Sequence, residues 1–211
     1  MRGLFNINNP VMRFIIKLFD CIVLSVLWAV FSLPIITMGA ATTALYYTVF
    51  HYLREEEGYL WKYFWNSFKE NFKRSTLASL ALLAMLAFLI YDAVALRLLI
   101  MAGNPLGRLY GVILVLIVVA IVWGIYLAAY CARFNGTVRE VLRISFYLMM
   151  AHPLRSLGIM AIVFMCGVLI ATIPGLAAFL PALSCWGASY WIEQIFELHL
   201  KQDEEKREEE S

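Results

Sequence analysis

Few side chains in this sequence have the type and spacing needed for chemistry, and the strongest candidate is an aspartate inside a long apolar segment. Asp92 lies within the apolar stretch 75–101, and Arg97 follows it by five residues. Ionisable side chains inside a bilayer are costly and often mark ion or solute paths. We therefore treat Asp92 and Arg97 as a candidate intramembrane polar site for a proton or solute. A purely structural role, capping a helix or pairing with an arginine, is the alternative.

Motifs of enzymes and metal sites are missing from the sequence. It contains no Walker loop, no HExxH and no GxSxG. The three histidines, His51, His152 and His199, each lie near the end of an expected helix, where capping and interfacial hydrogen bonds are the simplest roles. The four cysteines lie in apolar stretches without metal-ligand spacing. We therefore expect a non-enzymatic protein without a metal or other cofactor.

The composition identifies the solvent of this chain as a lipid bilayer. Of its 211 residues, 63% are hydrophobic and 15% are charged, against roughly 45–50% and about 25% in soluble domains. A soluble domain of this size cannot bury so much apolar surface. The net charge of +2 is not concentrated on one soluble face, as a nucleic-acid binder would require. These features exclude a water-soluble enzyme, a nucleic-acid-binding protein and a disordered chain.

Six segments are long and apolar enough to be membrane spans, since about 20 residues cross the hydrocarbon core. They define an all-α helical bundle in a single membrane domain, residues 1–200. A charged tail, residues 201–211, follows, and we expect it to be disordered. The six expected spans are residues 14–33, 35–53, 75–101, 109–132, 156–173 and 177–199.

The basic residues predict the orientation of these spans. With six spans, 15 of the 17 Lys and Arg residues fall on one side and only Arg97 and Arg108 on the other. If segment 35–53 did not cross, the split would be 12 to 5. Basic residues are enriched in cytoplasmic loops. The six-span arrangement with both termini in the cytoplasm is therefore favoured.

Two segments between spans have the pattern of amphipathic surface helices. In residues 60–74, aromatic side chains share one helical face and lysines share the other, as in helices that lie at a membrane interface. Residues 138–152 repeat the pattern with an apolar stripe opposite two arginines. We expect both helices on the cytoplasmic side, where they could contact lipid or a partner protein. The candidate contact residues are Trp61, Lys62, Lys69, Lys73, Arg74, Arg139 and Arg143.

A motif in the first half of the chain resembles a known family. Leu27-Trp28 precedes the stretch SLPIITMGAATTALY at residues 32–46, and Glu57-Gly58 and residues 68–73 follow. This pattern resembles the YesL family, small bacterial membrane proteins catalogued as a domain of unknown function. The resemblance covers about residues 5–200. It implies the plasma membrane of a Gram-positive bacterium and genes beside carbohydrate ABC importers and glycan-degrading enzymes. It supplies no catalytic residues.

Two functions are compatible with these features. The first is a non-enzymatic membrane accessory protein that contacts the lipid bilayer and the permease subunits of a carbohydrate or oligosaccharide ABC importer. The second is a stand-alone transporter or channel for a small solute. Asp92 favours the second function, as does a weak parallel repeat of span, surface helix and span in the two halves of the chain.

Overall fold

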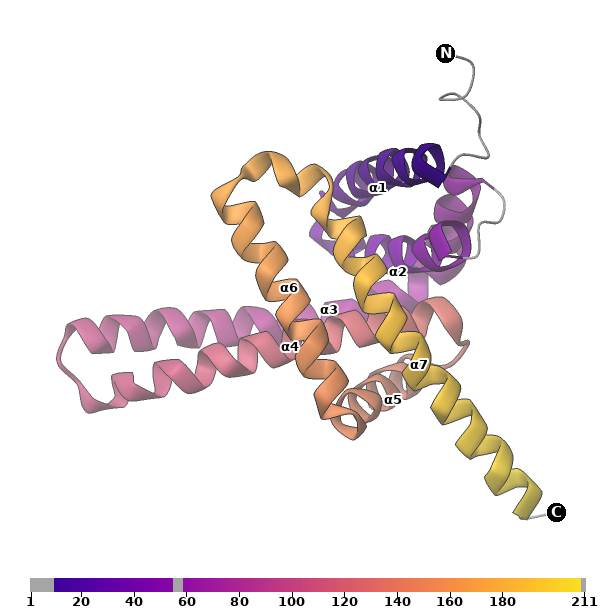
Figure 1. Cartoon of the computed structure of the whole chain (residues 1–211). Coiled ribbons are helices and arrows are strands. Elements are labelled where there is room, and N and C mark those ends of the chain that lie inside the picture. Colours follow the sequence, from indigo (N-terminus) through magenta and orange to yellow (C-terminus); the bar gives the residue numbers. More distant parts are fainter. Residues whose placement is uncertain (1–9, 55–58, 210–211) are drawn as a thin grey trace.

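Every element in the computed structural model is a helix, over the residues that the structure describes (10–54 and 59–209). The chain is thus an all-helical membrane protein (Figure 1). The α-helices are α1 (Pro10–Ser32), α2 (Met38–Thr48), α3 (Leu60–Met101), α4 (Tyr110–Arg133), α5 (Val138–Ala151), α6 (Pro153–Thr172) and α7 (Leu180–Glu209). Short helical turns join them: η1 (Ile35–Thr37), the π-helical η2 (Val49–Arg54), η3 (Pro105–Leu109) and η4 (Pro174–Ala178).

The turn between α1 and α2 is built by the residues of the family-like motif. Pro34 cannot extend α1, because it has no backbone N–H. The Thr37 hydroxyl lies 2.6 Å from the carbonyl oxygen of Phe31 and 2.8 Å from that of Pro34. It therefore donates a hydrogen bond to carbonyl oxygens that have no helical N–H partner at the end of α1. The Trp28 indole N–H donates to the Thr42 hydroxyl at 3.1 Å and ties α1 to α2.

Helix α2 is buried among α1, α3, α4 and α7. It approaches α3 very closely at Gly39, where a Cβ atom would lie 2.0 Å from the Ser79 hydroxyl oxygen and 2.9 Å from the Ser75 carbonyl oxygen. One turn later the Thr43 and Ser75 hydroxyls are hydrogen-bonded at 2.9 Å. Small and hydroxyl residues in this segment therefore allow close helix contact, as is common between membrane helices.

Helices α3 and α4 form a long hairpin that extends away from the other helices (Figure 1). The 42 residues of α3 correspond to about 63 Å of helix, twice the roughly 30 Å of a hydrocarbon core. The sequence predicted a surface helix over 60–74 and a separate span over 75–101. The structure joins them without a break, since no Gly or Pro occurs between Leu60 and Met101. We call the part of this hairpin from residue 84 to residue 118 the arm.

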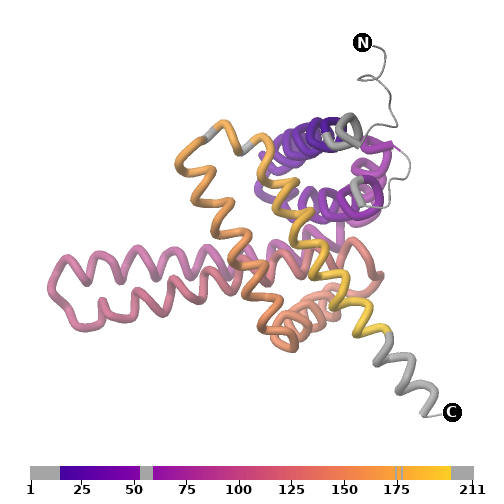
Figure 2. The backbone as a smooth tube through the Cα atoms, viewed as in Figure 1, coloured from indigo at the N-terminus to yellow at the C-terminus, as the bar shows by residue number. Residues whose placement is uncertain are grey.

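The C-terminal part consists of α5 and the hairpin of α6 and α7 (Figure 2). A capping box begins α5: the Glu140 carboxylate accepts from the Thr137 backbone N–H at 2.8 Å, and the Thr137 hydroxyl accepts from the Glu140 N–H. Helix α7 continues to Glu209. Residues 201–209 are rich in Glu, Lys and Arg, which are strong helix formers.

Among the residues that the structure describes, four helical segments are long and apolar enough to cross a membrane: Ile15–Ser32, Leu60–Met101, Pro105–Arg133 and Pro153–Thr172. Between 11% and 33% of the residues in their most apolar windows are buried within the protein, so most of these side chains are free to face lipid. The expected spans 35–53 and 177–199 are not among the four. Helices α2 and η2 together reach only about 25 Å, and α7 combines its apolar residues with charged ones.

Two apolar cores hold the helices together. One lies between α1, α2 and α3, around Leu24, Ala44 and Phe64. The other lies between α4, α5, α6 and α7, around Tyr126 and Ile192. The two cores meet where α2 and α7 contact each other, which is also where the most buried charge in the described residues lies.

Candidate functional site

A buried carboxylate connects three helices where the two cores meet. Glu193 of α7 is only 1% exposed. Its Oε1 atom accepts a hydrogen bond from the Tyr46 hydroxyl of α2 at 2.9 Å. Its Oε2 atom lies 3.1 Å from Nη1 of Arg133, at the end of α4. A carboxylate in an apolar interior is tolerated only when it is paired and hydrogen-bonded, so this contact set fixes α2, α4 and α7 relative to one another.

Arg133 is the more exposed partner of this ion pair and lies at the edge of the protein. Its side chain is 30% exposed, and its guanidinium lies over the Phe50 ring at 4.7 Å from the ring centroid. A cation over an aromatic face is electrostatically favourable. A positive charge in the last turn of α4 also interacts well with the helix dipole. We refer to Tyr46, Phe50, Arg133 and Glu193 as the Glu193 cluster.

A second arginine joins α3 to the end of α4. The Arg74 guanidinium donates to the Cys131 carbonyl oxygen, to Asn71 Oδ1 at 2.6 Å and to Asn135 Oδ1 at 3.1 Å. Asn71 is held in turn by a hydrogen bond to the Ser67 carbonyl oxygen at 3.2 Å. Arg74, predicted as a contact for lipid or a partner, is therefore used within the protein to fix the base of the hairpin.

The predicted intramembrane pair lies elsewhere, on the arm. Asp92 is half-buried and Arg97 is exposed, both on α3. Within the part of the chain that the structure describes, no hydrogen bond or ion pair joins them. The structure therefore brings Asp92 neither to Arg97 nor to the Glu193 cluster.

The remaining predicted residues lie on two separate surfaces. On the first turns of α3, the exposed Trp61 ring stacks on Trp65 at 6.0 Å, and Lys69 lies over Trp65 at 4.7 Å. Lys62 and Lys73 are exposed on the same helix. Arg139 and Arg143 are exposed on α5, beside a groove between α4 and α5.

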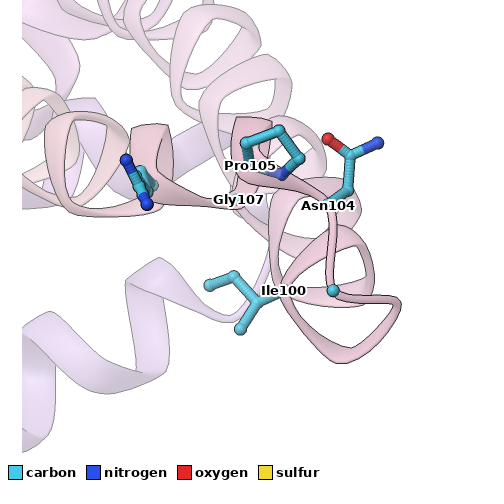
Figure 3. A pocket seen from close by; sticks show the side chains of 6 residues that line it. Ile100, Asn104, Pro105 and Gly107 are labelled. Carbon is cyan, nitrogen blue, oxygen red and sulfur yellow. The ribbon is translucent and has the colours of Figure 1, made fainter.

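The tip of the arm carries a shallow hollow between α3 and η3. Ile100, Gly103, Asn104, Pro105, Gly107 and Arg108 line it (Figure 3). The turn itself explains this hollow: the Asn104 side chain accepts from the Leu106 N–H at 3.0 Å, Gly103 has a φ of +73°, and Gly107 packs directly on Ile100. Its lining adds no catalytic pair and no ligand set.

Metal-ligating side chains do not gather in residues 10–54 and 59–209: no group of three or more His, Cys, Asp or Glu is close enough to hold an ion. The Glu193 cluster has one carboxylate, one guanidinium and one phenol. That set can hold or transfer a proton or stabilise a helix junction, but it offers no nucleophile activated by a base.

One comparison found a similarity between the first half of the chain and a known family. Residues 21–93 match the model of a family described as "Protein of unknown function, DUF624". This match confirms the resemblance to the YesL family. The matched segment includes Tyr46, Arg74 and Asp92 but not Arg133 or Glu193. No curated protein and no solved structure matches the chain.

The Glu193 cluster was not predicted from the sequence. The available signal was the position of Glu193 one turn deeper in its helix than Glu197. Its partners lie 60 and 147 residues away in the chain, and local spacing carries no information about contacts of that length. Tyr46 was part of the motif that carries the family resemblance, but its contact needs the three-dimensional structure.

Proposed function

We propose that this chain is a non-enzymatic accessory protein of the bacterial plasma membrane that associates with the permease subunits of a carbohydrate ABC importer. The importer partner is taken from the resemblance to the YesL family, and the family match over residues 21–93 supports that resemblance. The structure supports the other part, which is action by association with another membrane protein.

The observation that carries the proposal is the exposed apolar surface of the arm. The arm extends beyond the other helices (Figure 1), and its large side chains are mostly uncovered: Phe88 is 64% exposed, Tyr91 72% and Leu98 62% on α3, and Val115 is 62% exposed on α4. Gly111 has open space where a Cβ would lie. Small residues beside apolar side chains suit close packing of a partner helix in a membrane.

The proposed topology has six spans and cytoplasmic termini. The two ends of the hairpin differ in charge, which supports this orientation: Arg97 and Arg108 lie toward its tip, whereas Arg74 and Arg133 lie at its base with most other basic residues. Helices α2 and α7 would be the second and sixth spans. Because α2 is enclosed by neighbouring helices, a slightly short crossing is compatible with its position.

Affinity purification from native membranes in mild detergent, followed by mass spectrometry, tests the function. The proposal predicts recovery of an importer permease. A variant with Phe88, Tyr91 and Val94 changed to alanine should lose the permease, whereas the matched control with exposed Phe164, Met165 and Val168 on α6 changed to alanine should keep it. Equal loss from both variants, or no permease with the wild-type chain, would contradict the proposal.

A stand-alone transporter is the second candidate, and the Glu193 cluster is the observation that favours it. Buried charges in membrane helices commonly line ion or solute paths. This candidate predicts solute flux into vesicles that contain only this chain, and loss of flux on Glu193→Gln or Asp92→Asn at normal protein levels. Vesicles without flux, together with a recovered permease, would leave the accessory function.

A further inference from the structure

The structure contains an apolar groove with two arginines at its rim, between the middle of α4 and the amphipathic helix α5. Its lining consists of one residue from α4 and five from α5: Trp123, Val138, Arg139, Leu142, Arg143 and Phe146. The groove is open to the surface and has mainly apolar walls. This combination is separate from the Glu193 cluster and from the arm.

The floor of the groove is held in place by internal contacts. The Trp123 indole N–H donates to the Ser145 hydroxyl at 3.0 Å, and this hydroxyl donates to the Leu142 carbonyl oxygen at 3.2 Å. The Phe146 ring meets Trp123 edge to face, with centroids 5.4 Å apart. Because the polar atom of Trp123 is satisfied inside the protein, the ring leaves an apolar surface for the groove.

The rim of the groove carries two adjacent positive charges. Arg139 and Arg143 are one turn apart on α5 and exposed, and in the described residues neither guanidinium has a hydrogen bond or an ion pair. The nearby Glu140 carboxylate accepts the Thr137 N–H at the start of α5. Like charges four residues apart on a helix repel each other, so an anion bound between them would remove an unfavourable interaction.

We propose that this groove binds an anionic phospholipid. The phosphate accepts hydrogen bonds from Arg139 and Arg143, since guanidinium groups match phosphate oxygens in pairs. One acyl chain lies along Trp123, Leu142 and Phe146. A single ligand with a phosphate next to a hydrocarbon chain satisfies both the charged rim and the apolar floor, whereas free phosphate satisfies only the rim. This inference does not depend on the importer proposal.

Lipid selectivity of the purified full-length chain tests this site. Native mass spectrometry of the detergent-solubilised protein would be recorded with phosphatidylglycerol, with phosphatidylcholine of the same acyl chains, and with inorganic phosphate. The proposal predicts retention of phosphatidylglycerol in preference to phosphatidylcholine and no measurable retention of phosphate. Equal retention of the two lipids, or retention of phosphate as strong as that of the lipid, would overturn it.

Variants locate the binding. The double variant Arg139→Gln/Arg143→Gln should bind phosphatidylglycerol about 30-fold more weakly, if each basic residue at a membrane surface contributes as usual. The matched control Arg97→Gln/Arg108→Gln removes two exposed arginines at the arm tip and should bind as the wild type does. Leu142→Asn should also weaken binding while leaving both charges. Unchanged affinity in the Arg139/Arg143 variant would place the lipid elsewhere. An acidic amphipathic peptide would then compete with phosphatidylglycerol for the groove. If the peptide displaces bound lipid at a lower concentration than phosphatidylglycerol does, the groove belongs to a protein partner and the proposal is overturned.

Discussion

Replacing Arg133 by alanine should destabilise the protein, because it removes the Arg133 guanidinium from beside the buried Glu193 carboxylate. Glu193 is 1% exposed and Arg133 30% exposed, so the lost partner is partly screened whereas the remaining charge is not. Removing one partner of a buried ion pair typically costs about 3–5 kcal/mol. Allowing for the exposure of Arg133, we expect about 2–3.5 kcal/mol at pH 7.

Proton uptake sets a ceiling on this cost. A carboxyl group with the ordinary glutamate pKa of about 4.3 takes up a proton at pH 7 for about 3.7 kcal/mol, and at pH 5 for about 1 kcal/mol. Glu193 in the Arg133→Ala variant can reduce its burial penalty by this route. The destabilisation of the Arg133→Ala variant should therefore shrink as the pH falls from 7 to 5.

Thermal unfolding in detergent measures the effect. At about 2–4 °C per kcal/mol for a chain of this size, the variant should lose roughly 4–14 °C in Tm at pH 7 and no more than about 4 °C at pH 5. Arg97→Ala, which removes an exposed arginine from the arm, serves as control and should change Tm little. Arg133→Met combined with Glu193→Gln should recover most of the loss, because no unpaired charge remains.

An Arg133→Ala variant with wild-type Tm at pH 7, or with the same loss in Tm at both pH values, would show that the Arg133–Glu193 ion pair does not stabilise the fold in this way. Glu197→Gln is the matched control on α7, since Glu197 is exposed one turn after Glu193. A loss in Glu197→Gln as large as in Glu193→Gln would mean that burial does not determine the effect.

Three further predictions concern other parts of the fold. Gly39→Ala should cost about 1–3 kcal/mol in unfolding free energy, because its Cβ would fall 2.0 Å from a hydroxyl oxygen of α3, whereas Gly111→Ala, with open space around it, should be neutral or slightly stabilising in the same thermal assay. Lys69→Glu combined with Lys73→Glu should release an importer permease in pull-downs at equal protein levels if the start of α3 docks a partner; equal recovery would leave this surface as a lipid contact. Burial and the nearby Arg155 and His199 lower the pKa of His152 from 6.5. The folded state therefore disfavours the protonated ring, so stability is lost as the pH falls below about 6.5; His152→Gln should show a smaller drop in Tm between pH 7 and pH 5 than the wild type.

The helical membrane fold could be predicted because it depends on composition and local patterns. Apolar runs determine where α3 and α4 extend, the absence of Gly and Pro leaves α3 unbroken, and Thr137 with Glu140 determines where α5 begins. The limits of these elements were less predictable. The pattern changes from amphipathic to apolar near Arg74, which suggested that one helix ends there and another begins. A helix can pass from the membrane interface into the apolar interior without any break in its backbone hydrogen bonds.

The contacts of the polar residues could not be predicted, because they join distant parts of the chain. Arg74 has the pattern of a surface cation, yet the end of α4 supplies its hydrogen-bond acceptors. Asp92 was a candidate because it is an acidic residue in an apolar run. The acidic residue that the structure buries is Glu193, and the other charged residues of α7 make its apolar run harder to recognise in the sequence. Local sequence identifies ionisable residues in apolar segments, but only packing decides which of them are enclosed.

Photo-crosslinking from the arm in native membranes tests whether this protein works by association with another membrane protein. A photoreactive amino acid would replace Tyr91, which is 72% exposed on the arm, and a second sample would carry it at Phe164 on α6. We expect a discrete adduct with an importer permease from position 91 and not from position 164. Adducts with lipid alone at position 91, in cells that express the importer, would contradict it.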